Sequence, residues 1–305
     1  MTEQKIVRRI VTSWKLRSRT LELGRRTLVM GVVNITPDSF SDGGRFLQPE
    51  AAIAHGISLL DEGADLLDLG AESTRPGSRA GGEDATVDAE KEQDRLLPVL
   101  DGILSARPEA IVSIDTYKAA TARKALAAGA QIVNDVSGFG WDAEMAGVCA
   151  EAGCGVVLMH TRGRPEEWRA QAQLDPNELV ATVSKGLEAS LERAARAGIA
   201  TERIVLDPGY GFGKRLGENF ALLARQEELL ALGYPLLAGV SHKSFLGNAL
   251  APMYEGKSAP VEARETASLA AMTAAILHGA ALVRVHRVRE AREAALVADA
   301  VLEAA

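Results

Sequence analysis

The chain has 305 residues, of which 47% are apolar and 25% are charged, and its formal net charge is −7 at pH 7. These values are ordinary for a soluble globular protein and exclude extensive disorder. The acidic balance argues against a nucleic-acid partner, because domains that bind phosphates usually carry a basic face. No apolar stretch approaches the roughly 20 residues that span a bilayer, and the charged N-terminus lacks a signal-peptide core, so we expect a cytoplasmic protein without a membrane partner.

The first elements are short. Residues 15–31 hold two strand-like runs around Gly24, which predict a β-hairpin that covers the bottom of the following domain. We therefore expect residues 1–28 to form an N-terminal extension and hairpin.

Short runs rich in Val, Ile and Leu then alternate with longer amphipathic stretches to the end of the chain. The amphipathic stretch at residues 178–198 is typical, because its helical pattern closes on Gly198. Runs this apolar are typical of parallel strands buried on both faces. They occupy residues 27–34, 65–70, 110–115, 131–137, 155–160, 203–208, 235–241 and 281–286.

Roughly eight strand and helix units favour a closed (β/α)8 TIM barrel over an open doubly wound sheet. No linker or composition shift marks a second domain, so residues 1–305 are expected to form a single α/β domain. The two cysteines, Cys149 and Cys154, lie without a nearby His cluster and make a poor zinc site. We expect both to be reduced, packed thiols.

Active sites of such barrels lie just after the strands. Each run here ends in polar or charged residues, namely Asn34, Glu72, Thr74, Arg75, Asp115, Asn134, Asp135, His160, Arg162, Asp207, Lys243, Ser244, Arg284 and His286. Any one of them has an ordinary alternative as a helix cap or a solvated charge. Their presence at every strand end predicts a binding site.

The candidate residues fall into two chemical sets. Arg75, Lys243, Arg284 and His286, with the hydroxyls of Thr74 and Ser244, suit an anionic group. The second set could hydrogen-bond to the donors and acceptors of a nitrogen heterocycle, and it consists of Asp115, Asn134 and Asp207. If the anionic group is a pyrophosphate that leaves during the reaction, Mg²⁺ is the metal ion expected to neutralise its charge. The amide oxygen of Asn34 would be a suitable ligand for Mg²⁺.

Seven segments together carry a family resemblance. In order, they are GVVNITPDSFSDGG, DLLDLGAESTRPGS, VSIDTYK, IVNDVSG, VLDPGYGFGK, GVSHKSFLG and VRVH, between Met30 and His286. The chain resembles the dihydropteroate synthases, a pterin-binding TIM-barrel family. The resemblance implies condensation of 6-hydroxymethyl-7,8-dihydropterin pyrophosphate with p-aminobenzoate, giving 7,8-dihydropteroate and pyrophosphate in folate biosynthesis.

The resemblance also implies where each substrate binds. The pterin would be held by Asp115, Asn134, Asp207, Lys243 and Phe212. The pyrophosphate would lie over Asn34, Thr74, Arg75, Arg284 and His286, with Mg²⁺ held partly by Asn34. The aminobenzoate carboxylate would approach Ser244, near Phe40 and Pro76, and Asp42 would help to cover it.

An SN1-like path fits these groups, because loss of pyrophosphate leaves a cation delocalised into the pterin ring. Cations and Mg²⁺ would hold the leaving group, and a buried carboxylate, Asp115, would stabilise the pterin cation. The neutral arylamine then attacks without a strong general base.

The polar loop Thr36 to Gly44 follows the first run and would cover the intermediate. We expect it to be mobile without ligands, with Gly43 and Gly44 as hinges, and ordered with both substrates bound.

Three departures from the family pattern stand at His242, usually Arg, at Arg287, usually an acid, and at Thr161, more often Met. The first could alter sulfonamide sensitivity, and together they leave a weakly active pterin-binding paralogue as one alternative. A methyltetrahydrofolate:corrinoid methyltransferase is the other, although it gives the cationic set no role. The resemblance further suggests a homodimer built around Ala267 to Gly279, a helix whose Ala-rich face could equally pack on the barrel.

Overall fold

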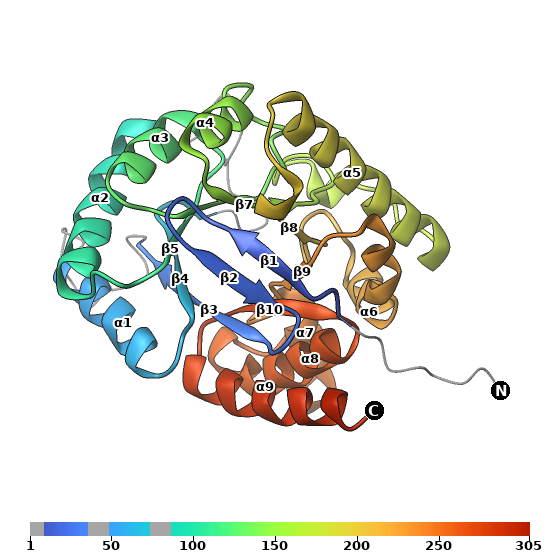
Figure 1. The fold of residues 1–305 in the computed structure, drawn as a ribbon. Coiled ribbons are helices and arrows are strands. Elements are labelled where there is room, and N and C mark those ends of the chain that lie inside the picture. Colours follow the sequence, from blue (N-terminus) through green and yellow to red (C-terminus); the bar gives the residue numbers. More distant parts are fainter. Residues whose placement is uncertain (1–8, 36–48, 74–86) are drawn as a thin grey trace.

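The computed structural model describes residues 9–35, 49–73 and 87–305 of the protein. Eight parallel strands close into a barrel in the order β10-β3-β4-β5-β6-β7-β8-β9 (Figure 1). They are β3 Leu28–Asn34, β4 Leu66–Gly70, β5 Val112–Asp115, β6 Ile132–Asp135, β7 Gly155–Met159, β8 Ile204–Asp207, β9 Leu236–Ala238 and β10 Ala280–Val285. The prediction of a (β/α)8 barrel is confirmed.

Helices surround the barrel (Figure 1). They are α1 Pro49–Asp61, α2 Ala89–Ala106, α3 Ala119–Ala127, α4 Met145–Ala152, α5 Pro176–Arg196, α6 Leu216–Ala224, α7 Ser244–Ala249, α8 Glu265–Leu277 and α9 Val288–Glu303. The 3-10 turns are η1 Trp168–Ala170, η2 Thr201–Arg203, η3 Gln226–Leu232, η4 Ala251–Met253 and η5 Val261–Arg264. None of the helices in the described ranges is both long and apolar enough to cross a membrane.

Helix α5 covers the amphipathic stretch predicted at residues 178–198, and its sequence marks both of its ends. Asp175 and Glu178 make a reciprocal capping box at the start of α5, with Pro176 in the first turn. After the last turn, Gly198 adopts φ +83°, a left-handed conformation that glycine takes without a steric penalty.

The strand register brings the polar strand ends to one rim of the barrel. Gly70 of β4 lies beside Asp115 of β5, and Asp115 lies beside Asn134 of β6. Met159 of β7 lies beside Asp207 of β8. Because all neighbouring strands are parallel, the residues that end them converge on the same face.

The N-terminal hairpin differs from its predicted position. Its strands are β1 Thr12–Lys15 and β2 Thr20–Leu23, so its turn falls at residues 16–19 and not around Gly24. A backbone hydrogen bond from Leu16 to Arg19 closes this turn without a glycine. Gly24 instead leaves β2 with φ +91°, where an added Cβ would lie 2.2 Å from the carbonyl oxygen of Ile10.

The hairpin covers the bottom of the barrel, as predicted. Trp14, Leu16 and Leu23 pack in one cluster with residues that begin or lie early in the barrel strands, including Leu28 and Leu66. The indole Nε1 of Trp14 donates to the carbonyl oxygen of Arg203, at 2.8 Å. Figure 1 shows both strands lying across the barrel opening. This leaves the opposite end of the barrel for a site.

The two cysteines are buried and free, which confirms the prediction of packed thiols. Cys149 lies on α4, and Cys154 directly precedes β7.

Candidate active site at the carboxyl ends of the barrel strands

Polar side chains from four strands meet at the carboxyl end of the barrel. Asp115 ends β5, Asn134 lies near the end of β6, Asp207 ends β8, and Arg284 lies near the end of β10. Asn134 and Asp207 are each only 5% exposed. These four residues were predicted from the sequence, and the closed barrel explains how segments so distant in the chain come together.

The guanidinium of Arg284 bridges two carboxylates. Its Nε donates to Oδ2 of Asp68 at 2.6 Å, and its Nη2 donates to Oδ2 of Asp115 at 2.8 Å. The sequence had placed Arg284 with the anion-binding residues and Asp115 with the heterocycle-reading residues. The ion pairs show that the two sets share one network.

Asp68 is a site residue that the sequence reasoning missed. It lies in the middle of β4, is completely buried, and accepts from Nδ2 of Asn134 at 3.0 Å. It does not stand at a strand end, where active-site residues of such barrels are expected. The available signal was a single carboxylate inside the otherwise apolar run Leu66–Gly70, because an acidic side chain is almost never fully buried unless it is paired.

Burial sets the charge state of these carboxyl groups. Removal from water raises the pKa of Asp115 to about 7, against the attraction of Arg284 and with a further contribution from the negative charge of Asp68. Burial also raises the pKa of Asp207, although the backbone N–H of Gly209 donates to its Oδ1 at 2.7 Å. The pocket thus concentrates carboxyl groups that gain from a donor-rich or cationic ligand.

Lys243 and Phe212 face each other beside this pocket. The Nζ of Lys243 lies 4.0 Å from the centroid of the Phe212 ring, which is a cation–π distance. Trp168 meets the same ring edge-on, with centroids 5.1 Å apart and an interplanar angle of 79°. Phe212 is therefore supported by two side chains, one from the β7–α5 connection and one that precedes α7.

Lys214 holds the loop that carries Phe212. Its buried ammonium donates to the carbonyl oxygens of His160, Gly209 and Phe212, at 3.2, 2.7 and 3.3 Å. Burial lowers the pKa of Lys214 to about 7. These three bonds tie the loop after β8 to the end of β7.

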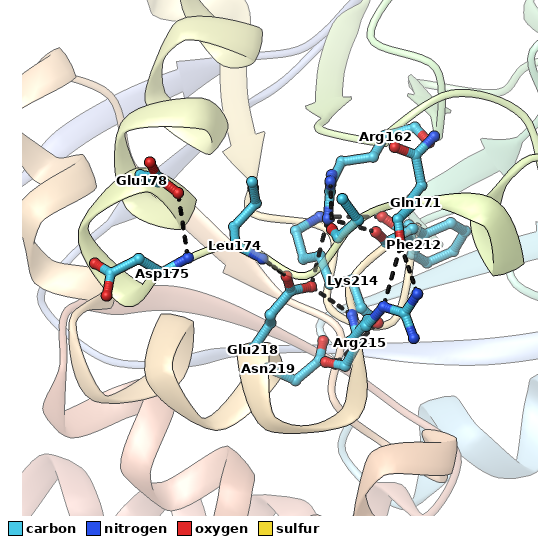
Figure 2. A network of polar contacts seen from close by, with 12 residues as sticks. Arg162, Gln171, Leu174, Asp175, Glu178, Phe212, Lys214, Arg215, Glu218 and Asn219 are labelled. Atoms are coloured by element: carbon cyan, nitrogen blue, oxygen red, sulfur yellow. Dashed lines mark hydrogen bonds and ion pairs between the residues drawn. The ribbon is translucent and has the colours of Figure 1, made fainter.

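A second network fastens the β7–α5 connection to α6 (Figure 2). Glu218 accepts from the backbone N–H of Leu174 at 2.6 Å and of Arg215 at 2.5 Å, and lies 3.5 Å from Nη1 of Arg162. Arg162 also donates to the carbonyl oxygen of Ala172, at 2.9 Å. Arg162, a strand-end candidate, therefore has a structural role in these contacts.

Two imidazoles stack at the ends of β9 and β10. The rings of His242 and His286 have centroids 4.5 Å apart and an interplanar angle of 9°. Nδ1 of His286 lies 2.9 Å from the hydroxyl of Ser241, and Nε2 of His242 lies 2.7 Å from Glu265 of α8. His242 adopts φ +59°, a conformation uncommon for residues other than glycine. The departure at His242 thus stands in contact with a predicted anion-binding residue.

Two strand-end candidates face away from the pocket. The ring of His160 lies against α5, where a Cβ added at Gly186 would come within 2.3 Å of it. Asp135 accepts from the backbone N–H groups of Ser137 and Phe139, at 2.7 and 3.0 Å, and so organises its own loop. Both side chains therefore have local structural roles and do not contribute to the candidate site.

Several predicted residues lie outside the described part of the chain. They are Phe40, Asp42, Thr74, Arg75 and Pro76, together with the whole loop Thr36 to Gly44. Asn34, the predicted Mg²⁺ ligand, ends β3 and is half-buried. Within the described ranges, no group of three or more His, Cys, Asp or Glu side chains could hold a metal ion.

Comparison with known proteins identifies relatives over nearly the whole chain. The family described as "Pterin binding enzyme" matches residues 30–286. A dihydropteroate synthase of Mycobacterium leprae is 45% identical over 90% of this chain and 94% of its own.

Solved structures agree in fold. A Xanthomonas albilineans dihydropteroate synthase with 4-aminobenzoic acid is 39% identical, with a TM-score of 0.83 over 96% of this chain and 98% of that chain. A Yersinia pestis dihydropteroate synthase with a sulfonamide drug complex is 36% identical, with a TM-score of 0.85 over 96% of this chain and 100% of that chain.

Proposed function

The chain belongs to the family of pterin-binding enzymes, and we propose that it acts as a dihydropteroate synthase. It is a transferase that joins 6-hydroxymethyl-7,8-dihydropterin pyrophosphate to p-aminobenzoate and releases pyrophosphate. One observation from the geometry carries this proposal: Asp115, Asn134 and Asp207 converge, largely buried, at the carboxyl end of a closed barrel.

The pterin is the substrate that these groups suit. Its pyrimidine edge presents ring and amino N–H donors as a guanidine does, and a carboxylate accepts such a pair as it accepts an arginine fork. Asp207 would accept from this edge, and Asn134 would present its amide to the ring. Phe212 and Lys243, held 4.0 Å apart, would bound the same ligand.

The anionic ends of the substrates would lie further out. Lys243, Arg284 and His286, with Thr74 and Arg75, would bind the pyrophosphate, and exposed Ser244 at the start of α7 would meet the aminobenzoate carboxylate. Phe40, Asp42 and Pro76 would cover the aminobenzoate. Sulfonamides, which one related structure contains, would compete for that position.

Mg²⁺ is proposed as the cofactor. The amide oxygen of Asn34 fits a hard cation, and Mg²⁺ usually keeps few protein ligands while phosphate oxygens and waters complete its shell. When bound, the ion would neutralise charge on the leaving group.

The reaction would break the bond between the pterin methylene carbon and the pyrophosphate oxygen, with the electron pair leaving on oxygen. The resulting cation is delocalised into the pterin ring, where ionised Asp115 would stabilise it. The amine lone pair of p-aminobenzoate then forms the new C–N bond, and the nitrogen loses one proton. Arg284, which binds Asp115 at 2.8 Å, would keep that carboxylate in place.

We also propose that the protein is a homodimer that uses α8 and the adjoining α9. The two helices pack against each other on the outside of the barrel (Figure 1). On α9, Leu296 and Val297 are 60% and 66% exposed, and Val301 is 45% exposed. Three large apolar side chains on one solvent-facing helix favour a second protein surface.

Genetic complementation tests the proposed function. A bacterial strain that lacks its own dihydropteroate synthase should grow without supplied folate end products when it expresses this chain. The Asp207→Ala variant, produced at the same level, should not support growth. Failure of the folded wild-type protein to restore growth would favour the paralogue or methyltransferase alternatives.

A further inference from the structure

Asp68 joins two of the proposed site residues through a single oxygen atom, Asn134 from the pterin set and Arg284 from the pyrophosphate set. It lies on β4 between Val32 of β3 and Ser113 of β5 in the strand register, and it is completely buried. Its Oδ2 accepts from Nε of Arg284 at 2.6 Å and from Nδ2 of Asn134 at 3.0 Å. The backbone of a rigid barrel strand therefore fixes the point to which both side chains are bound.

The bond to Asn134 decides which end of its amide a ligand meets. An amide side chain has a donor end and an acceptor end, whereas an ionised carboxylate only accepts. Asp68 therefore takes the NH₂ end of Asn134, and the carbonyl oxygen Oδ1 becomes the atom that can accept from a pterin N–H. Without Asp68, the amide could turn over and present a donor in its place.

The bond to Arg284 fixes the second side chain. The guanidinium is planar and rigid, so contacts at two of its nitrogen atoms determine its orientation. Asp68 holds Nε, and Asp115 holds Nη2 at 2.8 Å. Loss of Asp68 would leave Arg284 free to rotate about its remaining contact, and Asp115 would move with it.

Asp68 also contributes to the charge of the pocket. Asp68 adds a negative charge beside Asp115, a carboxyl group that also feels the charges of Arg284, Glu92 and Lys243. The negative charge of Asp68 is one of the causes that raise the pKa of Asp115. Negative charge in a buried site favours a cationic intermediate.

We propose that Asp68 is a positioning residue for the reaction, which orients the amide of Asn134 toward the pterin and holds the guanidinium of Arg284 in place for the pyrophosphate. This inference rests on the proposed function. Asp68 need not touch the substrate, because it acts through the two side chains that it binds.

The test compares Asp68→Asn with a matched control, Asp65→Asn. Asp65 lies just before β4, at the opposite end of the same strand, and likewise binds two arginines, Arg26 and Arg292, each at 2.6 Å. Both variants replace a paired carboxylate by an amide. For each protein, kcat and KM are measured for both substrates across pH 5.5–9, together with thermal unfolding and the affinity for 6-hydroxymethylpterin, which lacks pyrophosphate.

We expect Asp68→Asn to lower kcat/KM for the pterin pyrophosphate by roughly 100-fold, the scale of loss when reacting groups are displaced by about 1 Å. Affinity for 6-hydroxymethylpterin should fall, whereas KM for p-aminobenzoate should stay within about twofold. The pH midpoint of kcat/KM should move down, because a negative neighbour of Asp115 is lost. Asp68→Glu, which keeps the charge, should recover part of the activity, and Asp65→Asn should change only the unfolding temperature.

The inference is wrong if Asp68→Asn behaves as Asp65→Asn does, with lower thermal stability but an unchanged pH midpoint and pterin affinity. Equal losses for both substrates would also overturn it. If Asp68→Asn does not fold, Asp68→Ser is measured by the same criteria. An inactive but folded wild-type protein would refute the proposed function, whereas an active wild type with an unaffected Asp68→Asn variant refutes this inference alone.

Discussion

Asp115 shares one guanidinium with the completely buried Asp68, and burial raises the pKa of Asp115. A buried ion pair of this kind gains little stability overall, but its removal leaves an uncompensated charge. We infer that its value to the protein lies in holding a carboxylate at a defined place in the proposed pterin site. The same burial makes the charge of that carboxylate depend on pH in the neutral range.

The first prediction concerns this pH dependence. The pKa of Asp115 is raised to about 7, so the carboxyl is largely protonated below pH 6 and largely ionised above pH 8. Since only the ionised form stabilises a pterin cation, kcat/KM for the pterin pyrophosphate should rise with pH through about 7. The Asp115→Asn variant should lose both the activity and this rise. A wild-type profile that falls across the same range would contradict the role of Asp115.

At this scale, the sequence predicted which residue types end the strands but not how they pair. Asn134 and Asp207 were found because the barrel rule assigns strand ends to the site. Asp68 was missed because it lies in the middle of a strand. The pairing of Arg284 was not predictable because it depends on closure of the barrel between β10 and β3. The side-chain directions of His160 and Asp135 depend on the pleat, which residue type alone does not reveal.

Two elements at opposite ends of the barrel have different roles. Strand β8 ends in Asp207, the loop after it carries Phe212, and Lys214 holds this loop through three carbonyl oxygens. The β1–β2 hairpin fills the other end of the barrel with Trp14, which is 1% exposed. Changes in these two elements should therefore have different consequences.

Replacement of the loop anchor should impair pterin binding. Lys214→Met keeps the volume of the side chain but leaves three buried carbonyl oxygens without their donor, at a cost of about 1–3 kcal/mol each if none finds another partner. We expect a lower unfolding temperature and weaker binding of 6-hydroxymethylpterin, with KM for p-aminobenzoate changed less. Calorimetric titration and thermal unfolding measure both effects. Unchanged pterin affinity would mean that the loop holds its shape without Lys214.

Replacement of the hairpin tryptophan should affect stability alone. Trp14→Ala removes a fully buried ring and should lower the free energy of unfolding by about 3–5 kcal/mol in denaturant titrations. Because Trp14 lies at the end of the barrel opposite the pocket, kcat/KM at a temperature well below unfolding should stay within about threefold. A large loss of activity in the folded variant would show that the two ends are coupled.

The order and type of these elements were predictable because apolar runs and helical periodicity repeat along the chain. The hairpin turn was not, since Gly24 resembles a turn signal and the actual turn at residues 16–19 contains none. A backbone hydrogen bond across Leu16 and Arg19 and the packing of Leu16 against the barrel decided its position.

For the whole molecule, a net charge of −7 coexists with a pocket that is proposed to receive an anionic substrate. Local cations such as Lys243 and His286 can bind a pyrophosphate despite the overall charge, because screening limits long-range repulsion to about 8–10 Å at physiological salt. The exposed apolar residues of α9 take no part in these charge interactions, and we propose that they support self-association.

Sedimentation equilibrium tests the homodimer. The wild-type protein should show twice the chain mass of 32.3 kDa, and Val297→Glu should reduce it to that of one chain by placing a charge on the apolar α9 surface. Leu216→Glu, at an exposed apolar position at the start of α6, serves as the control and should leave the mass unchanged. A wild-type protein with the mass of a single chain would mean that α8 and α9 pack against the barrel and form no dimer interface.

The central claim is tested most directly by product stoichiometry. The purified protein is incubated with the pterin pyrophosphate, p-aminobenzoate and Mg²⁺, and 7,8-dihydropteroate and pyrophosphate are quantified together by mass spectrometry and a phosphate assay. A dihydropteroate synthase should form the two products in equal amounts, and omission of p-aminobenzoate should abolish dihydropteroate. Release of no pyrophosphate above background, or release of pyrophosphate without dihydropteroate, would contradict the account.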